Sequence, residues 1–153
     1  MNKPSQPSAK LEREYWRKKK LTDMSHEEWE ALCDGCGKCC LHKIRGPGNS
    51  LQSTNVGCRL LDVNSCRCKN YPKRKKLVPD CVVLSPESLE VIDWLPRTCA
   101  YRLVKNGQDL PHWHPLVSGD PESVHRAGVS VRGRSISEQD AGPLHTHVVP
   151  WHF

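Results

Sequence analysis

The chain has 153 residues, and 23 Lys and Arg against 17 Asp and Glu give it a formal net charge of +6 at pH 7. Leu, Ile, Val and Phe together make up only about a fifth of the residues. This is close to the level below which a chain struggles to bury a core, so we do not expect a large self-sufficient hydrophobic core. The longest wholly apolar stretch is 81–84, which excludes a transmembrane helix because such a helix needs about 20 apolar residues.

Residues 1–20 predict a disordered basic arm. The segment is rich in Pro, Ser and Gln at its start, ends in consecutive cations at 17–20, and has no pattern that could form a core. It also lacks the apolar segment of a secretory signal, so we expect the protein in the cytoplasm. Residues 21–137 are the predicted cysteine-cluster domain, and 138–153 are a predicted poorly ordered tail that contains histidines.

A short helix is expected over residues 26–32. Ser25 can cap its first turn, while Glu28, three residues on, reaches back to the Ser25 backbone in a capping box. Met24 and Trp29 occupy the positions of a hydrophobic staple. This helix delivers the first cysteine of the chain to a glycine-rich stretch that is suited to tight turns.

Two more helices are predicted further along the chain. Ser85 and Pro86 form a good helix opening, and the apolar face that follows consists of Leu89, Ile92 and Leu95. The second helix is expected over 99–105, with Thr98 as its cap.

Strands are predicted at only a few places. Residues 45–55 predict a loop, and 56–63 a strand or short turn. Val129 and Val131 alternate with polar neighbours, as residues of a strand do. The sequence therefore predicts a small irregular α+β fold, with short helices and a few strands organised around one or two cysteine-ligated metal centres.

Nine cysteines dominate the sequence. A reducing cytoplasm keeps most thiols from pairing, and the odd number also argues against a disulfide framework. Buried free cysteines that pack as small apolar side chains are another alternative. The regular spacing favours metal ligation instead, because thiolates are preferred ligands of zinc and of iron–sulfur clusters. The predicted metal ligands are Cys33, Cys36, Cys39, Cys40, Cys58, Cys66, Cys68, Cys81 and Cys99.

The most specific pattern is C-x2-C-x2-C-C, at residues 33–40. A two-residue spacer lets both thiols of a pair turn onto one ion, and Gly37 lets backbone amides approach the thiolates. Adjacent Cys39 and Cys40 cannot easily reach one tetrahedral ion, so we expect them to serve different atoms, in two centres or in one multinuclear centre. The remaining cysteines supply distal ligands, and His42 is a candidate substitute ligand.

The ligand type does not decide between zinc and iron. Zinc would make the centres structural and would stabilise a thin core outright, because a metal-binding free energy of about 10–16 kcal/mol at neutral pH becomes folding free energy. An iron–sulfur cluster would permit electron transfer or radical chemistry. Metal chelation is the main functional interpretation, with no catalytic residue assigned. An iron–sulfur redox or modifying enzyme is the first alternative.

The chain contains a set of ordered motifs: CDGCGKCCLHK at 33–43, TNVGCRLL at 54–61, SCRCKNY at 65–71, PDC at 79–81, WLPRTCAYRL at 94–103 and WHPL at 113–116. This set resembles the bacterial YcgN-type family, a group within the CxxCxxCC proteins. The resemblance covers about residues 15–137 and implies zinc or iron chelation by the cysteines, without implying a reaction. The CxxCxxCC motif alone is also similar to the flagellin lysine methylase, and we do not carry methylation over from it.

The basic run 67–76 (RCKNYPKRKK) is the best candidate for binding a nucleic acid or an acidic partner. It contains six cations and no acid, from Arg67 to Lys76, and Tyr71 is available for stacking. The alternative is a solvated loop that neutralises the thiolate centre. A metal-stabilised nucleic-acid or protein adaptor is therefore the second alternative function, and we expect a monomer that does not bind membranes.

Histidine pairs occur at His112 and His114 and at His145 and His147, where either pair could add a metal site. The simpler interpretation is that Trp113 packs on the small core and its flanking histidines are partly exposed. Trp29 and Trp94 are expected in the core as well, because they are large apolar side chains in a chain that is short of aliphatic residues.

Overall fold

The computed structural model describes residues 13–79, 81, 83–90 and 95–150. This part of the chain forms short helices and short strands. In chain order they are α1 (Tyr15–Lys18), α2 (His26–Ala31), β1 (Leu41–Arg45), β2 (Leu51–Gly57), β3 (Leu61–Asp62), β4 (Arg67–Cys68), α3 (Arg74–Leu77), α4 (Ala100–Lys105), α5 (Pro115–Ser118), α6 (Ser123–Arg126) and β5 (Ile136–Ser137). The predicted small fold of mixed helices and strands is confirmed.

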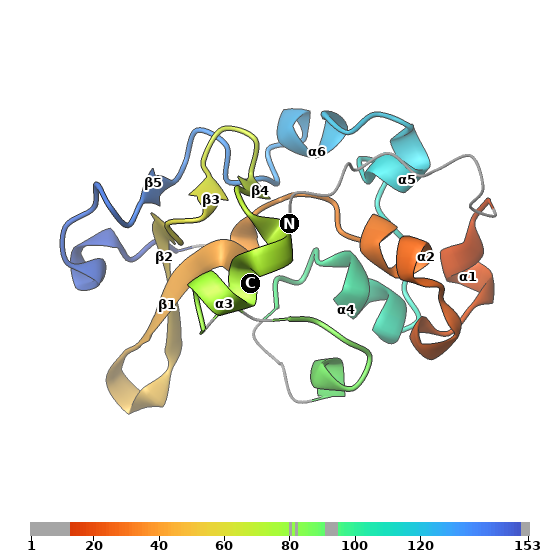
Figure 1. The fold of residues 1–153 in the computed structure, drawn as a ribbon, viewed down its shortest axis with the longest axis horizontal. Helices are drawn as coiled ribbons and strands as arrows, with labels where there is room; N and C mark the ends of the chain where they lie inside the picture. The colour runs from red at the N-terminus through yellow and green to blue at the C-terminus, as the bar shows by residue number, and fades with distance from the viewer. Residues whose placement is uncertain (1–12, 80, 82, 91–94, 151–153) are drawn as a thin grey trace.

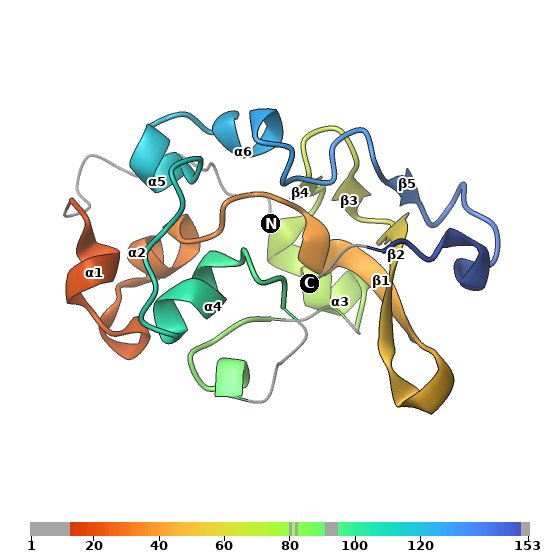
Figure 2. The ribbon, with the colours of Figure 1, turned by 180° about the vertical axis from the view of Figure 1, so that it is seen from behind.

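The helices and the strands gather at opposite ends of the molecule (Figures 1 and 2). Helices α1, α2, α4 and α5 lie at one end, the strands lie at the other, and α3 lies between them. The cysteine-rich turn 33–40 runs from the end of α2 to the start of β1. This turn therefore connects the two halves of the fold.

The helical end contains the larger of two buried clusters. Its buried members are Tyr15, Trp16, Leu32, Leu89, Leu95, Ala100, Tyr101 and Leu110. Two tyrosines tie the helices together through their hydroxyls: Tyr15 donates to the Glu28 carbonyl at 2.6 Å, and Tyr101 donates to the Trp29 carbonyl at 2.8 Å. Aromatic side chains thus supply much of a core that contains few aliphatic residues.

Helix α2 begins as the sequence predicts. The Ser25 hydroxyl accepts the Glu28 backbone N–H at 3.1 Å, and the Glu28 carboxylate accepts the Ser25 backbone N–H at 2.9 Å. This capping box is confirmed. The predicted staple residues Met24 and Trp29 both pack against the helical core.

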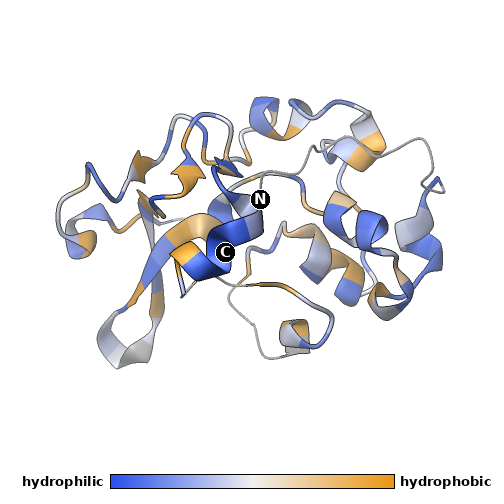
Figure 3. Ribbon diagram, viewed as in Figure 1, coloured by the Kyte–Doolittle hydropathy of each residue, from blue (hydrophilic) through white to orange (hydrophobic). Residues whose placement is uncertain are grey.

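The strand end consists of two small sheets. Strand β1 pairs with β2 in an antiparallel hairpin, with Ile44 opposite Gln52, and the short β5 adds to β2 in parallel. Strands β3 and β4 form a second antiparallel pair. The second buried cluster lies here and comprises Leu41, Leu61, Cys66 and Val131. Figure 3 shows apolar residues interspersed with polar ones in these strands.

Two segments that were predicted to be disordered are packed where the structure describes them. Residues 1–12 of the predicted arm lie outside the described residues, but α1 within the arm buries Tyr15 and Trp16 in the helical core. In the predicted tail, the Val149 N–H donates to the Ser53 carbonyl at 2.9 Å, so this part follows β2. The structure differs from the predicted disorder at both places, because large side chains and backbone groups there find partners.

Several element boundaries also differ from the prediction. The predicted loop 45–55 contains the last residue of β1 and the first five of β2, because the Gly-Pro-Gly segment makes a hairpin turn and pairing resumes directly after it. The helix predicted from Ser85 is a single 3-10 turn at Ser88–Glu90, and residues 91–94, with Ile92 and Trp94, lie outside the described residues.

Helix α4 confirms the helix predicted over 99–105, but its cap is Cys99 and not Thr98. The strand predicted around Val129 and Val131 is not formed. The Val131 N–H instead donates to the Cys36 carbonyl at 2.9 Å. This single bond fastens the C-terminal segment onto the cysteine-rich turn.

Candidate metal centres

The cysteine-rich turn folds back on itself directly after α2. Asp34 Oδ1 accepts the Cys36 backbone N–H at 3.0 Å, and the Cys40 N–H donates to the Gly37 carbonyl at 3.1 Å. Gly37 has a φ of 77°, and a Cβ placed there would lie 2.8 Å from Val131 Cγ2. Glycine therefore allows both the left-handed backbone and the close approach of the C-terminal segment.

Four thiols lie on the helical side of this turn. Three of them come from the turn, and the fourth stands at the N-terminus of α4. Burial first, and then the Asp34 carboxylate, raise the pKa of Cys33 to about 12 and that of Cys36 well above its ordinary value, and Cys99 adds to both shifts. Burial also raises the pKa of Cys99 to about 11. We call this group the first thiol set: Cys33, Cys36, Cys39 and Cys99.

A second group of thiols lies on the strand side. The Cys58 N–H donates to the Cys40 carbonyl at 2.9 Å, and Cys68 lies on β4. Burial is the largest cause of the raised pKa of Cys81, and Cys40, Cys58 and Cys68 add to it in turn. Cys58 is likewise influenced by Cys40 and Cys68. We call this group the second thiol set: Cys40, Cys58, Cys68 and Cys81.

The adjacent pair Cys39 and Cys40 stands where the two sets meet. A hydrogen bond between the two thiols raises the pKa of Cys39 well above its ordinary value and lowers that of Cys40 to about 7. The positive charges of Lys43 and Arg74 also lower the pKa of Cys40. Cys39 is influenced further by Cys33 and Cys36, whereas Cys40 influences Cys58 and Cys81. The two neighbours in sequence thus link the two sets.

Cys66 belongs to neither set, although Cys40 packs against the same buried cluster. It is 1% exposed, has a φ of 63°, and packs with Leu41, Leu61 and Val131 in the second buried cluster. Burial raises the pKa of its thiol, against a hydrogen bond with Ser130. Of the nine predicted ligands, eight influence one another electrostatically in two groups of four, and Cys66 packs in the second buried cluster.

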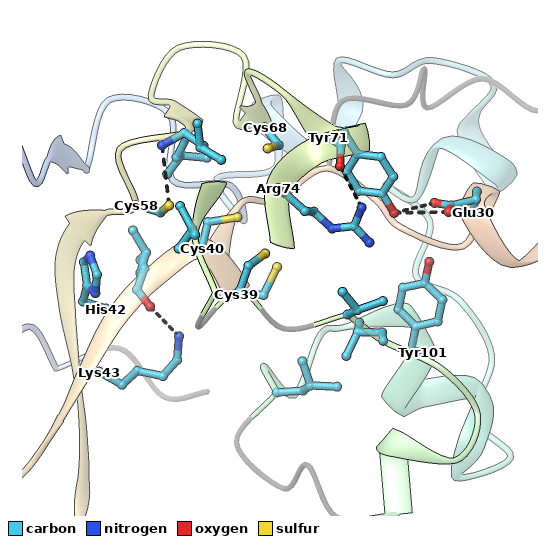
Figure 4. Close-up of a pocket in the computed structure, with 18 of the residues that line it drawn as sticks. Glu30, Cys39, Cys40, His42, Lys43, Cys58, Cys68, Tyr71, Arg74 and Tyr101 are labelled. Carbon is cyan, nitrogen blue, oxygen red and sulfur yellow. Dashed lines mark hydrogen bonds between the residues drawn. The ribbon is translucent and has the colours of Figure 1, made fainter. Parts of the chain in front are cut away.

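A cavity of about 850 Å³ lies beside the second thiol set (Figure 4). All four thiols of that set and Cys39 line it, together with the aromatic side chains of Trp29, Tyr71 and Tyr101. Leucine and valine side chains make up much of the remaining wall. The cavity therefore combines sulfur ligands, aromatic faces and aliphatic surface in one space.

Two cations stand on the wall of this cavity next to the thiols. Lys43 Nζ donates to the Leu41 carbonyl at 2.8 Å, and burial lowers the pKa of the ammonium to about 8, against the opposing influence of Cys39 and Cys40. The Arg74 guanidinium lies over the Tyr71 ring, with its carbon 3.8 Å from the ring centroid. Both cations favour the thiolate over the thiol at Cys40.

A buried acid and a buried histidine stand behind the first thiol set. Asp34 is 4% exposed, and its Oδ2 is buried with no hydrogen-bond partner among the described residues. Burial raises the pKa of Asp34. His114 is fully buried, donates from Nε2 to the Leu32 carbonyl at 2.7 Å and accepts the Leu116 N–H at Nδ1. The expectation of a partly exposed histidine is therefore wrong at His114, whose hydrogen bonds satisfy a neutral ring.

The other candidate histidines do not join the thiols. His42 Nε2 pairs with the Glu138 carboxylate, and His147 Nδ1 lies 3.1 Å from Asn55 Oδ1. In the described part of the chain, no group of three or more Cys, His, Asp or Glu side chains is arranged to hold a metal ion as they stand. The thiols within each set thus lie near one another, and their side chains would have to turn inward to complete a coordination shell around an ion.

The basic run 67–76 is divided among three local structures. It begins in β4, continues through a 3-10 turn and ends in α3, which Figure 3 shows as predominantly hydrophilic. Lys73, Lys75 and Lys76 are exposed. Tyr71 is less available than predicted, because its hydroxyl donates to Glu30 and Arg74 covers one face of its ring.

Sequence reasoning missed three residues that matter for this region. Asp34 lies in the two-residue spacer between Cys33 and Cys36, so its carboxylate is close to two thiols. Lys43 is the third residue after the CxxCxxCC motif. Arg74 lies in the basic run, and the sequence does not distinguish it from the neighbouring lysines, which are exposed, whereas Arg74 lines the cavity.

None of the helices in the described ranges is long and apolar enough to cross a membrane.

Comparison with known proteins places these residues in a recognised group. Residues 32–100 match the sequence family CxxCxxCC, described as a "putative zinc- or iron-chelating domain". A UPF0260 protein of Granulibacter bethesdensis is 60% identical over 138 residues, which is 90% of this chain and 83% of that protein. A UPF0260 protein of Rhizorhabdus wittichii is 60% identical over 136 residues, 88% of this chain and 93% of the relative. No solved structure matches.

Proposed function

The chain belongs to the UPF0260 family of bacterial proteins, and we propose that it holds two metal centres, of zinc or iron, through eight cysteine thiolates. The first thiol set forms one centre and the second thiol set forms the other. Cys66 serves as a buried structural side chain. The observation that carries the proposal is that Cys33, Cys39 and Cys99 pack against the helical cluster, whereas Cys40, Cys58, Cys68 and Cys81 line the cavity on the strand side, with the Cys39–Cys40 pair where the two groups meet.

The residues of each set fit such a centre. Four thiolates are the ligand set of all-cysteine zinc sites and of iron–sulfur clusters. Burial and mutual repulsion disfavour four neighbouring thiolates without a cation, and a bound metal removes that cost. When bound, zinc would supply structural cross-linking, and an iron–sulfur cluster would supply electron transfer.

The chain itself prepares the sites. The Asp34 carboxylate fixes the Cys36 backbone, the left-handed Gly37 turns the chain between the second and third ligands, and Lys43 offsets negative charge at Cys40. Cys99 and Cys81 bring in segments that are distant in the sequence. Each metal therefore cross-links elements that a small apolar core holds only weakly.

The test is elemental mass spectrometry on protein purified without oxygen, with Cys36→Ser, Cys58→Ser and Cys66→Ser as matched variants. We expect about two zinc ions per chain, or iron with acid-labile sulfide, in the unmodified protein. C36S and C58S should each lose about half of the metal, and C66S should keep it all. Full metal content in C36S and C58S, or loss in C66S alone, would contradict the proposal.

The cavity beside the second thiol set favours a second candidate, an iron–sulfur redox or modifying enzyme. A reactive centre needs space for a substrate next to it, and a purely structural centre does not. This candidate predicts a brown protein with an absorption band near 400 nm, roughly where thiolate-to-iron charge transfer falls, that bleaches on reduction. Colourless protein with zinc alone would exclude it.

A further inference from the structure

We propose that the cavity beside the second thiol set binds a small organic acid, with Arg74 holding the acid group and the aromatic and aliphatic wall covering an apolar body. The proposal rests on the proposed function in one respect, because it takes the thiols on the cavity wall to be metal-bound. It adds a ligand class that the metal centre alone does not imply.

The size and lining of the cavity suit a small organic molecule. Its volume is about 850 Å³, within the range of roughly 300–1,000 Å³ that is usual for such sites. Trp29 and Tyr101 stand together on one wall, with ring centroids 4.6 Å apart. Leu60, Leu84 and Leu95 contribute aliphatic surface. A metal ion on the thiols would occupy only one side of this space.

Arg74 has the geometry of an anion-binding side chain. Its Nη1 donates to the Tyr71 carbonyl at 2.8 Å, and its guanidinium carbon lies 3.8 Å from the centroid of the Tyr71 ring, and these two contacts hold the group in place. It is half-buried and forms no ion pair with a described residue. A guanidinium has five N–H donors, so most of its fork is available to a carboxylate in a bidentate pair. Figure 4 shows the group between Tyr71 and the thiols.

The other charges on the wall are already engaged. Glu30 is the only carboxylate among the described lining residues, and it accepts the Tyr71 hydroxyl, which lies 2.9 and 3.1 Å from its two oxygens. Lys43 lies against the thiols, where it offsets the negative charge that four thiolates leave on a divalent ion. Arg45 is exposed at the end of β1 and has a partner of its own. Arg74 is therefore the cation best placed for an incoming acid.

The test uses fluorescence titration of the metal-loaded protein with anilinonaphthalene sulfonate, followed by displacement with benzoate or with its neutral counterpart benzamide. Benzoate should displace the probe more effectively than benzamide. Arg74→Gln should weaken the binding of the probe and of benzoate by about ten- to a hundredfold, since a charge-assisted hydrogen-bond pair is lost, and should leave benzamide unchanged. Lys76→Gln, an exposed cation of the same helix, should change affinity by less than about twofold.

Two further variants keep the proposal falsifiable. Arg74→Lys retains the charge without the fork and should bind benzoate with intermediate affinity. Leu84→Trp fills the cavity and should weaken benzoate and benzamide alike. Equal losses in R74Q and K76Q, or no saturable binding to the unmodified protein, would overturn the proposal.

Metal analysis of every variant separates this proposal from the proposed function. If the unmodified protein holds no zinc or iron, the proposed function fails whatever the probe does. If the metal is present and R74Q binds benzoate as the unmodified protein does, the cavity proposal fails alone. Loss of metal from R74Q, with unchanged probe affinity per loaded chain, would assign Arg74 to the metal centre and overturn the ligand site.

Discussion

Cys39 and Cys40 are neighbours in the chain, and the 3-10 turn that contains them directs their thiols to different groups. Their thiols hydrogen-bond to each other, so the two proposed centres meet at one peptide bond. A substitution at this pair would therefore disturb both proposed centres. Substitutions elsewhere in each set leave the other intact, which makes them the cleaner probes.

Cys66 is the one cysteine that the proposed function does not use as a ligand. Its left-handed backbone and its apolar neighbours in the second cluster suit a small buried side chain. Spacing in the sequence offers no way to distinguish it from Cys68, two residues later, because the difference comes from the left-handed backbone of Cys66 and its packing against distant residues.

Gly37→Ala should lower both stability and metal content. An alanine there combines a left-handed backbone with a Cβ only 2.8 Å from Val131 Cγ2, and we expect a cost of about 1–3 kcal/mol. Gly119 has a similar φ of 75° and nothing within 4 Å of its Cβ position, so G119A is the matched control for backbone strain alone. Thermal unfolding of both variants measures the difference, and equal losses would show that the contact with Val131 contributes nothing.

At the scale of single elements, α2 shows local sequence and structure in agreement. Its cap, its acidic first turn and its staple are all encoded within a few residues. Helix α4 shows the opposite case. Its cap position holds a cysteine without a capping hydrogen bond, while Thr98 Oγ1 is buried with no partner among the described residues. A ligand at the helix start is consistent with that departure from the usual capping chemistry.

The capping box also predicts a pH dependence. The backbone hydrogen bond from Ser25, and then the pair with Lys19 against the opposing effect of burial, lower the pKa of Glu28 from an ordinary value of 4.5. A carboxylate whose pKa is lower in the folded state stabilises the protein at pH values above its ordinary pKa. This stabilisation is lost as the pH falls through the folded-state pKa. Glu28→Gln should therefore be less stable than the unmodified protein at neutral pH, and the difference should shrink below pH 4.5.

We expect E28Q to lower the free energy of unfolding by roughly 1–2 kcal/mol at neutral pH. Melting temperatures measured between pH 3 and pH 7 check this prediction. Glu27→Gln on the exposed side of the same turn is the control and should show a much smaller difference. A gap between E28Q and the unmodified protein that stays constant across this pH range would contradict the assigned role of the carboxylate.

At the scale of the whole molecule, two modest cores are joined by one cysteine-rich turn. The helical cluster depends on aromatic side chains, and the strand cluster has four buried members. The free energy gained by burying such small cores exceeds the conformational entropy cost of folding by only a small amount. The proposed metal centres would cross-link the turn to α4 in one half, and to β4 and the segment after α3 in the other.

This arrangement predicts that loss of one metal loosens one half. In hydrogen–deuterium exchange, Cys36→Ser should raise exchange mainly in α4, and Cys58→Ser mainly in β3 and β4, because each variant removes the cross-link of its own half. Cys66→Ser, which leaves both sets intact, is the control for loss of a buried thiol. A uniform increase over the whole chain in both variants would contradict two separate centres.

The capping box of α2, the cysteine cluster and the small mixed fold could all be predicted without a structure, because they depend on composition or on residues close together in the chain. The grouping of the ligands could not. Folding brings Cys99 to the turn, and Cys58, Cys68 and Cys81 to Cys40; it also packs α1 into the core and places Arg74 on a cavity wall. These are contacts between distant segments, and their partners are chosen by packing and burial, which local patterns do not encode.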